Sequence, residues 1–288
     1  MNSSNPVFSR WNATRGTAPA DIGMHHPVGS AADARPGSHP LTNPYAPAQD
    51  AGPGLDVRAG RATMTLDDVV VRTATTLGTV ALAAVLSWLL LPVDEADIGR
   101  SYGIAVGAAL VAFVLSMIQA FKRTPSPALI LGYSAFEGVF LGVLSSATST
   151  YIAPGVVVQA VLGTFAVAAG MLVAYRLRWI RVTRRFAGVV GAGATGFLLL
   201  LVADSLFSAF GAGHGLGFHS GGLGIVFGLV GVVLGACFLA LNFKQVEDAV
   251  AFGAPREEAW LAAFGLTMTL VWIYLEVLQV LTILNSDA

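Results

Sequence analysis

The sequence predicts an all-α integral membrane protein with seven transmembrane helices. Hydrophobic residues make up 55% of the 288 positions and charged residues only 11%, whereas soluble domains carry about 25% charged residues. The mean hydropathy is +0.70. Seven apolar segments are each long enough to approach or exceed the roughly 20 residues that cross a bilayer, and basic residues alternate between their connectors. The lipid bilayer is therefore the expected partner of most of this surface.

A polar segment precedes the apolar ones. Residues 1–64 are rich in Pro, Gly, Ala, Ser and Asn and have no apolar periodicity, which predicts a disordered tail. The transmembrane domain is then expected over 65–288. Thr65 is the expected N-cap of its first helix, because two acidic residues follow in the first turn. The seven segments are predicted at 71–91, 101–121, 128–146, 152–175, 186–207, 223–243 and 260–284.

The connectors predict the orientation of the chain in the membrane. Lys122 and Arg123 lie between the second and third segments, and five arginines lie between the fourth and fifth. The loops after the first, third and fifth segments hold little positive charge beyond Arg100. Because cytoplasmic loops carry the excess of Lys and Arg, we expect a cytoplasmic N-terminus. Seven crossings then place the C-terminus outside.

Other functional classes lack support in the sequence. The net charge of −1 argues against a nucleic-acid partner, since binding a polyanion requires a basic surface. There is no G-x-S-x-G, H-E-x-x-H or Walker A motif, and no Cys/His cluster. The single cysteine, Cys237, is expected to be a packing residue. We therefore expect no enzyme, no metal site and no cofactor.

Two carboxyl groups lie inside apolar segments. Glu137 is near the middle of the third segment and Glu276 is past the middle of the seventh. A charged side chain there costs about 2.5–3.5 kcal/mol on insertion scales unless it faces protein or water. Thr269, Trp272 and Gln279 share a helix face with Glu276, so we expect that face to point into the bundle. The group is then either a structural contact, with the carboxyl neutral, or a proton or cation site.

Small residues predict where helices approach closely. Gly138 and Gly142 lie on one face of the third segment, and Gly231 and Gly235 lie on one face of the sixth. Such small-xxx-small spacing allows close backbone contact between membrane helices. A flexing joint is the functional alternative for these positions.

Three stretches together resemble the Bax inhibitor-1 (YccA-like) family, in its bacterial branch with a long N-terminal tail. They are GYSAFEGVFLG, LALNFKQVEDAV and AFGLTMTLVWIYLEVLQVL. The resemblance implies six helices around a central C-terminal helix in the plasma (inner) membrane. It implies one of two activities, a pH-responsive calcium leak or the regulation of a membrane-bound AAA protease or membrane-stress response.

The resemblance also assigns residues. The acid on the seventh helix matches Glu276, and the expected acid on the sixth falls at Asn242, with Lys244 where a second acid often stands. An Asn–Glu pair holds one titrating group and lacks the like-charge repulsion of a pH sensor made from two carboxylates. Direct contact between Asn242 and Glu276 requires the last helix to begin near Pro255. Otherwise Glu137 is the expected partner of Glu276.

The leading expectation is a leak for cations, calcium or protons, with Glu276, Asn242 and Glu137 along its path. A cytoplasmic latch is expected to join basic residues of the second connector to acidic residues after the sixth segment. The alternative is a non-transporting regulator that presents its tail to a partner such as a membrane AAA protease. The expected latch residues are Lys122, Arg123, Lys244, Glu247 and Asp248.

Overall fold

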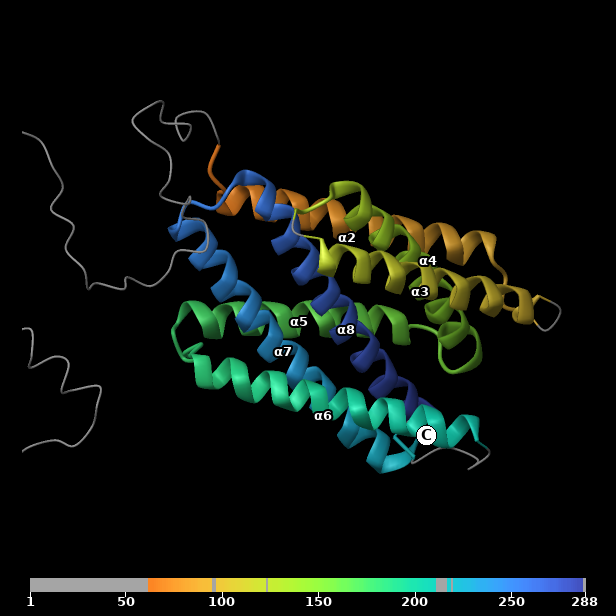
Figure 1. Cartoon of the computed structure of the whole chain (residues 1–288). Coiled ribbons are helices and arrows are strands. Elements are labelled where there is room, and N and C mark those ends of the chain that lie inside the picture. Colours follow the sequence, from red (N-terminus) through yellow and green to blue (C-terminus); the bar gives the residue numbers. More distant parts are fainter. Residues whose placement is uncertain (1–61, 95–96, 123, 211–216, 219, 287–288) are drawn as a thin grey trace, which may run out of the picture. The chain divides into compact units, whose positions relative to one another are not determined.

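The computed structural model describes residues 62–94, 97–122, 124–210, 217–218 and 220–286, and within these ranges it is helical apart from short connectors (Figure 1). All seven long helices have the length and composition to cross a membrane, which confirms the predicted multi-pass membrane fold. The helices are α2 (Leu66–Leu90), α3 (Ile98–Phe121), α4 (Pro127–Tyr151), α5 (Val156–Arg176), α6 (Arg184–Ala209), α7 (Gly221–Ala251) and α8 (Ala259–Ser286), with a 3₁₀ turn η2 (Arg256–Glu258) before α8.

The first helix begins where its capping signal predicted. The Thr65 hydroxyl accepts a hydrogen bond from the backbone N–H of Asp68, and the Asp68 carboxylate accepts one from the backbone N–H of Thr65. This reciprocal pair satisfies two backbone donors that a helix start leaves free. The predicted tail falls almost wholly on residues 1–61, which lie outside the described residues.

Two helices are longer than the apolar pattern predicted. Helix α7 continues to Ala251, eight residues past position 243, and η2 extends the start of α8 back to Arg256. Both extensions contain charged residues, KQVEDAVA in α7 and REE before α8, so hydropathy alone ended the segments too early. The turn between them uses Gly253 in a left-handed conformation, with φ of 66°. The predicted helix start after Pro255 is thereby confirmed.

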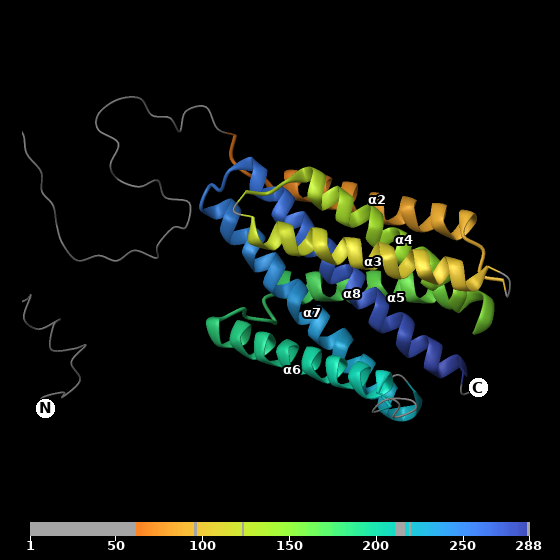
Figure 2. The same ribbon diagram turned by 45° about the vertical axis from the view of Figure 1, so that its right-hand side comes forward.

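Helix α8 is the central element of the bundle (Figures 1 and 2). It is the most buried of the seven helices and packs against α2, α4, α5 and α7. Helix α3 packs on α4, and α6 packs on α7, so these two helices lie farther from α8. The predicted central C-terminal helix is confirmed, with its neighbours arranged in an inner and an outer set.

Buried polar side chains connect α8 to three of its neighbours. The hydroxyl oxygens of Thr76 in α2 and Thr267 in α8 lie 2.6 Å apart. On another side of α8, the Tyr274 hydroxyl lies 2.6 Å from the hydroxyl of Ser145 in α4. Towards α7, the Thr269 hydroxyl accepts a hydrogen bond of 2.8 Å from the side-chain amide of Asn242. Hydrogen bonds of this kind contribute about 0.6 kcal/mol on average inside a membrane protein, and each one also fixes the rotation of α8.

The start of α2 is joined to the α7–α8 link. Met64 donates a backbone hydrogen bond of 2.8 Å to Ala254, and Arg256 donates one of 3.0 Å to Ala62. The Arg256 guanidinium contacts the Asp68 carboxylate at 2.7 Å. We call this end of the bundle, where α2 and α8 begin, the tail end, because the N-terminal segment enters the bundle here.

Candidate functional site

The polar face of α8 points towards α7, as its spacing predicted for the bundle interior. Thr269 and Glu276 are buried on this face. The face meets glycines of α7, because an added Cβ atom at Gly235 would lie 2.5 Å from Ile273 and one at Gly228 would lie 2.5 Å from Val280. The glycines therefore let the two helices approach closely, which confirms the packing role predicted for this glycine stripe.

Glu276 is enclosed in this interface, with only 8% of its surface exposed. Its Oε1 atom accepts a hydrogen bond of 3.1 Å from the indole N–H of Trp272. Its Oε2 atom is buried and has no hydrogen-bond partner among the described residues. A Cβ atom at Gly231 would lie 2.5 Å from the Glu276 Cδ and Oε2 atoms. The absent side chain of Gly231 thus provides the space that the carboxyl group occupies.

An aromatic cluster extends from Trp272, which donates to the Glu276 carboxyl group. The Trp272 ring packs against Phe197 of α6 and Phe238 of α7, with ring centroids 5.9 and 5.8 Å apart. Phe227 of α7 stacks on Phe197 at 4.3 Å and on Phe218 at 4.6 Å. These distances are typical of favourable aromatic pairs. The cluster separates Glu276 from the bilayer on the side of α6.

Asn242 does not contact Glu276, contrary to the expected pair. The Asn242 amide donates to the Thr269 hydroxyl at 2.8 Å and to the Gly265 carbonyl at 3.3 Å. Glu276 lies seven residues beyond Thr269, which is about 10 Å along the helix at 1.5 Å per residue. The last helical segment does begin next to Pro255, as the Asn242–Glu276 contact would require, but this start aligns Asn242 with Gly265 and Thr269.

Glu137 is not the partner of Glu276 either. Helix α4 contacts α8 through the hydroxyl pair of Ser145 and Tyr274 and through the ring pair of Tyr133 and Phe264. Tyr274 precedes Glu276 by two residues, and two residues turn a helix by about 200°, so α4 and α7 meet opposite faces of α8. Glu137 is half-buried and forms no hydrogen bond with a described residue. The two intramembrane carboxyl groups therefore lie on different sides of the central helix.

The expected latch between the second connector and the end of α7 does not form through Lys122. Asp248 pairs with Lys244 at 2.6 Å, as the i,i+4 spacing of the two residues predicted. The Glu247 carboxylate accepts a hydrogen bond from the Tyr175 hydroxyl of α5. Lys122 is exposed and pairs with no described residue. It directly follows α3, which packs on α4. Arg123 lies outside the described residues.

A small pocket of about 100 Å³ with mixed polar and apolar walls lies where α7 and α8 meet at the tail end. Asn242, Gln245, Glu258 and Gly265 contribute to its walls. This pocket was not predicted from the sequence. A signal was present, because the spacing of seven, four and seven residues places one set of positions on a single helix face. These positions are Glu258, Gly265, Thr269 and Glu276. The pocket, the Asn242–Thr269 bond and the Glu276 carboxyl thus lie in order along one interface.

The comparison with known families decides what this bundle is. A family model described as Bax inhibitor 1 like matches residues 5–286. The chain belongs to this family. Among the curated proteins, none matches the chain. Membership of the Bax inhibitor 1 like family agrees with the seven apolar helices and with the three stretches that carried the resemblance.

Proposed function

We propose that this Bax inhibitor 1 like protein is a low-capacity cation leak of the plasma membrane, with calcium as its cation. The observation that supports the proposal is the Glu276 carboxyl group, buried against Gly231 with one oxygen unpaired among the described residues. An unsatisfied buried polar atom costs about 1–3 kcal/mol. A bound proton or cation offsets that cost, and this is the ordinary role of ionisable residues at such depth.

The α7–α8 interface supplies oxygen atoms along a possible cation path. The tail-end pocket offers the Glu258 carboxylate and the side-chain oxygens of Gln245 and Asn242, and oxygen ligands of this type are the ones that calcium prefers. From Gly265 at that pocket to Glu276 the chain runs 11 residues, or about 16 Å at 1.5 Å per residue. That length is about half of the 30 Å hydrocarbon core. The path therefore leads from one surface to the middle of the bilayer.

The gate in this proposal is the packing of α7 on α8 around Glu276. The glycines of α7 and the aromatic cluster close the interface beyond the carboxyl group. Separation of the two helices at this level would open a continuous path. Because basic residues mark the tail end, we place that end in the cytoplasm, so that cations reach Glu276 from the cytoplasmic pocket or leave through it.

The test is calcium flux through vesicles that contain the purified full-length chain. Wild-type protein should carry calcium above the level of empty vesicles, and Glu276→Gln should reduce the flux to that level, because the amide lacks the negative charge. Glu257→Gln is the matched control, since Glu257 is an exposed acid before the same helix. Flux of Glu276→Gln equal to wild type would overturn the assignment of Glu276, and background flux in every variant would overturn the leak.

A pH series in the same vesicles tests whether the leak responds to pH through Glu276. Asn242 replaces the second acid that the family resemblance implied, so Glu276 is the carboxyl group that we assign to the response. The pH profile of wild-type flux should therefore be kept in Asn242→Ala, whereas Glu276→Gln should stay at the level of empty vesicles at every pH. Retention of the same pH profile by Glu276→Gln would contradict this assignment.

A second candidate function is regulation of a membrane protease or of a membrane-stress response through the tail. The observation that favours it is a pair of backbone hydrogen bonds, one from Met64 to Ala254 and one from Arg256 to Ala62. These bonds join the end of the tail to the link between α7 and α8. Deletion of residues 1–61 separates the two functions. A leak should persist after this deletion, whereas cross-linking of a membrane AAA protease to the chain should disappear if the tail carries the interaction.

A further inference from the structure

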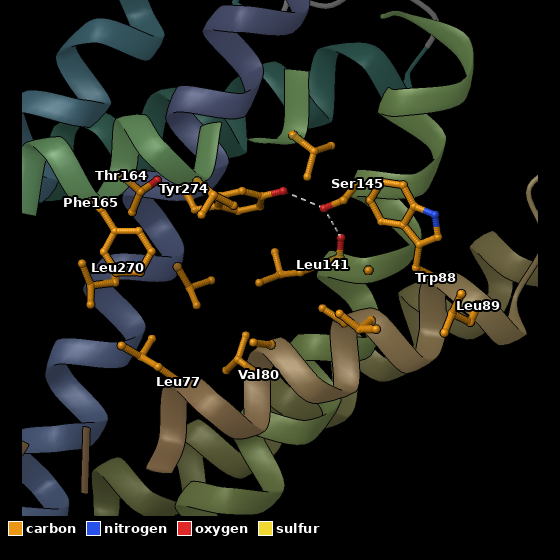
Figure 3. A pocket seen from close by; sticks show the side chains of 17 residues that line it. Leu77, Val80, Trp88, Leu89, Leu141, Ser145, Thr164, Phe165, Leu270 and Tyr274 are labelled. Carbon is orange, nitrogen blue, oxygen red and sulfur yellow. Dashed lines mark hydrogen bonds between the residues drawn. The ribbon is translucent and has the colours of Figure 1, made fainter. Parts of the chain in front are cut away.

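A lateral groove with a volume of about 530 Å³ lies on the side of α8 that faces α2, α4 and α5 (Figure 3). Leu77, Trp88 and Leu89 of α2 form one wall, and Phe165 of α5 stands across the space from them. Tyr274 of α8 contributes to the inner wall. All of these residues belong to helices with the length and composition to span a membrane, so the groove lies at the level of the bilayer.

The groove has a buried floor and an exposed rim. Tyr274 on the floor is 9% exposed, and Leu141 beside it is 5% exposed. Leu89 and Phe165 on the rim are 73% and 59% exposed. The space therefore reaches from the outer surface of the bundle to the central helix, and its entrance faces the hydrocarbon of the bilayer.

The hydroxyl groups that line the groove are already paired. The Ser145 hydroxyl lies 2.5 Å from the Leu141 carbonyl and 2.6 Å from the Tyr274 hydroxyl (Figure 3). The Thr164 hydroxyl donates to the Ala160 carbonyl at 2.8 Å. Because these hydroxyl groups have partners within the protein, an occupant needs no polar atom to satisfy them. The groove is suited to a purely apolar occupant.

The length of the groove matches one leaflet. Along α2 it extends from Leu77 to Leu89, which is twelve residues or about 18 Å at 1.5 Å per residue. Half of the hydrocarbon core is about 15 Å thick. Leu89 is one residue from the end of α2, and Trp88 lies beside it, a residue type enriched where membranes meet water. The groove therefore starts near one membrane surface and ends near the middle of the bilayer.

We propose that this groove binds one acyl chain of a bilayer phospholipid, with the headgroup at the surface beside Trp88. A transmembrane helix crosses the whole hydrocarbon core of about 30 Å, whereas the groove extends for only about 18 Å along α2. A flexible chain that enters from one surface fits both the length and the apolar walls. The occupied groove would bring lipid into contact with Tyr274 on the central helix.

The test uses a phospholipid that carries a photoreactive diazirine on one acyl chain. The full-length protein is reconstituted in vesicles of phosphatidylethanolamine and phosphatidylglycerol that contain this probe, illuminated and mapped by peptide mass spectrometry. Ordinary contact with lipid labels only exposed positions such as Leu162 on α5. Occupancy of the groove predicts additional labelling of α8 around Leu270 and Tyr274.

A matched pair of variants tests whether the α8 label comes from the groove. Ala81 lines the groove, and Ala74, one heptad earlier on the same face of α2, is exposed outside it. Ala81→Trp should reduce α8 labelling severalfold, whereas Ala74→Trp should leave it unchanged, with equal thermal unfolding in both variants. Labelling confined to exposed positions, or equal α8 labelling in the two variants, would overturn the site. Labelling of α8 by a diazirine fatty acid but not by the phospholipid would overturn the choice of occupant.

Discussion

Glycines line two helix contacts in this bundle and have a different role in each. In the α2–α4 contact, a Cβ atom at Gly138 would lie 2.4 Å from the Val80 carbonyl oxygen, and one at Gly142 would lie 2.2 Å from that of Ala84. In the α7–α8 contact, a Cβ atom at Gly231 would meet the carboxyl group of Glu276. The first contact brings backbone against backbone, and the second makes space for one ionisable side chain.

The difference shows that small-residue spacing alone does not separate a structural joint from a functional site. Backbone atoms cannot move aside without displacing a whole helix, so the α2–α4 contact leaves no room for change. A glutamate side chain can rotate, so the α7–α8 contact tolerates rearrangement at the level of Glu276. The bundle thus combines a fixed pair of helices with a pair that can adjust.

The largest expected effect is on the backbone contact. Gly138→Ala should lower the free energy of unfolding by about 3 kcal/mol, the upper part of the usual range for overpacking, because the new methyl group would overlap the Val80 carbonyl. Thermal unfolding of the purified protein in detergent measures the change. Gly78→Ala is the control, since no atom lies within 4 Å of its added Cβ, and it should leave stability equal or slightly higher.

A smaller loss is expected at the adjustable contact. Gly231→Ala should cost about 1–2 kcal/mol, because the Glu276 side chain must move away from the new methyl group. Combination with Glu276→Ala should cancel most of that cost, since the overlapping atoms are removed. A double-mutant cycle of unfolding free energies measures the coupling between the two sites. Purely additive losses would mean that the two residues do not share this space.

Hydrogen bonds join α8 to α2 on one side and to α7 on another. Thr267→Val removes the bond to Thr76 of α2, and Thr269→Val removes the bond from Asn242 of α7. Each change should lower stability by about 1 kcal/mol. Only Thr269→Val should also alter calcium flux, because its hydroxyl lies on the proposed path. Equal changes of flux in both variants would contradict a path confined to the α7–α8 interface.

The smallest effect is expected at the ion pair of the tail end, where the Arg256 side chain is 59% exposed and the Asp68 side chain is 11% exposed. Arg256→Gln removes this contact, and because water and salt screen the exposed guanidinium, the pair contributes little. Unfolding measured at low and high salt should show a slight loss at low salt that disappears at high salt. A large loss that persists at high salt would indicate that the join between α2 and the α7–α8 link is a main support of the fold.

The fold could be predicted from the sequence because lipid imposes simple demands. Apolar length predicted seven helices, the Thr65 signal predicted the first helix start, and the period of Thr269 and Glu276 predicted a buried face. Gly138 and Gly142 predicted close packing, although the spacing could not identify α2 as the partner. These features depend on one helix at a time, which is why sequence patterns reveal them.

The partners within the site could not be predicted in the same way. The neighbour of Glu276 proved to be Gly231, a residue without a side chain, and no polar pattern points to it. Asn242 was paired with Glu276 from the family resemblance, but the register of α7 on α8 places Asn242 beside Gly265 and Thr269. The pairing of Thr76 with Thr267 joins positions 191 residues apart that carry no mutual signal. Contacts between helices depend on rotation and register, which hydropathy does not report.

The most direct test of the account compares the two intramembrane carboxyl groups, one on each side of the central helix. Calcium flux is measured in parallel vesicles that contain equal amounts of folded Glu276→Gln and Glu137→Gln protein. We expect background flux for Glu276→Gln and wild-type flux for Glu137→Gln, because of these two residues only Glu276 lies in the α7–α8 interface. Loss of flux in Glu137→Gln with full flux in Glu276→Gln would contradict it.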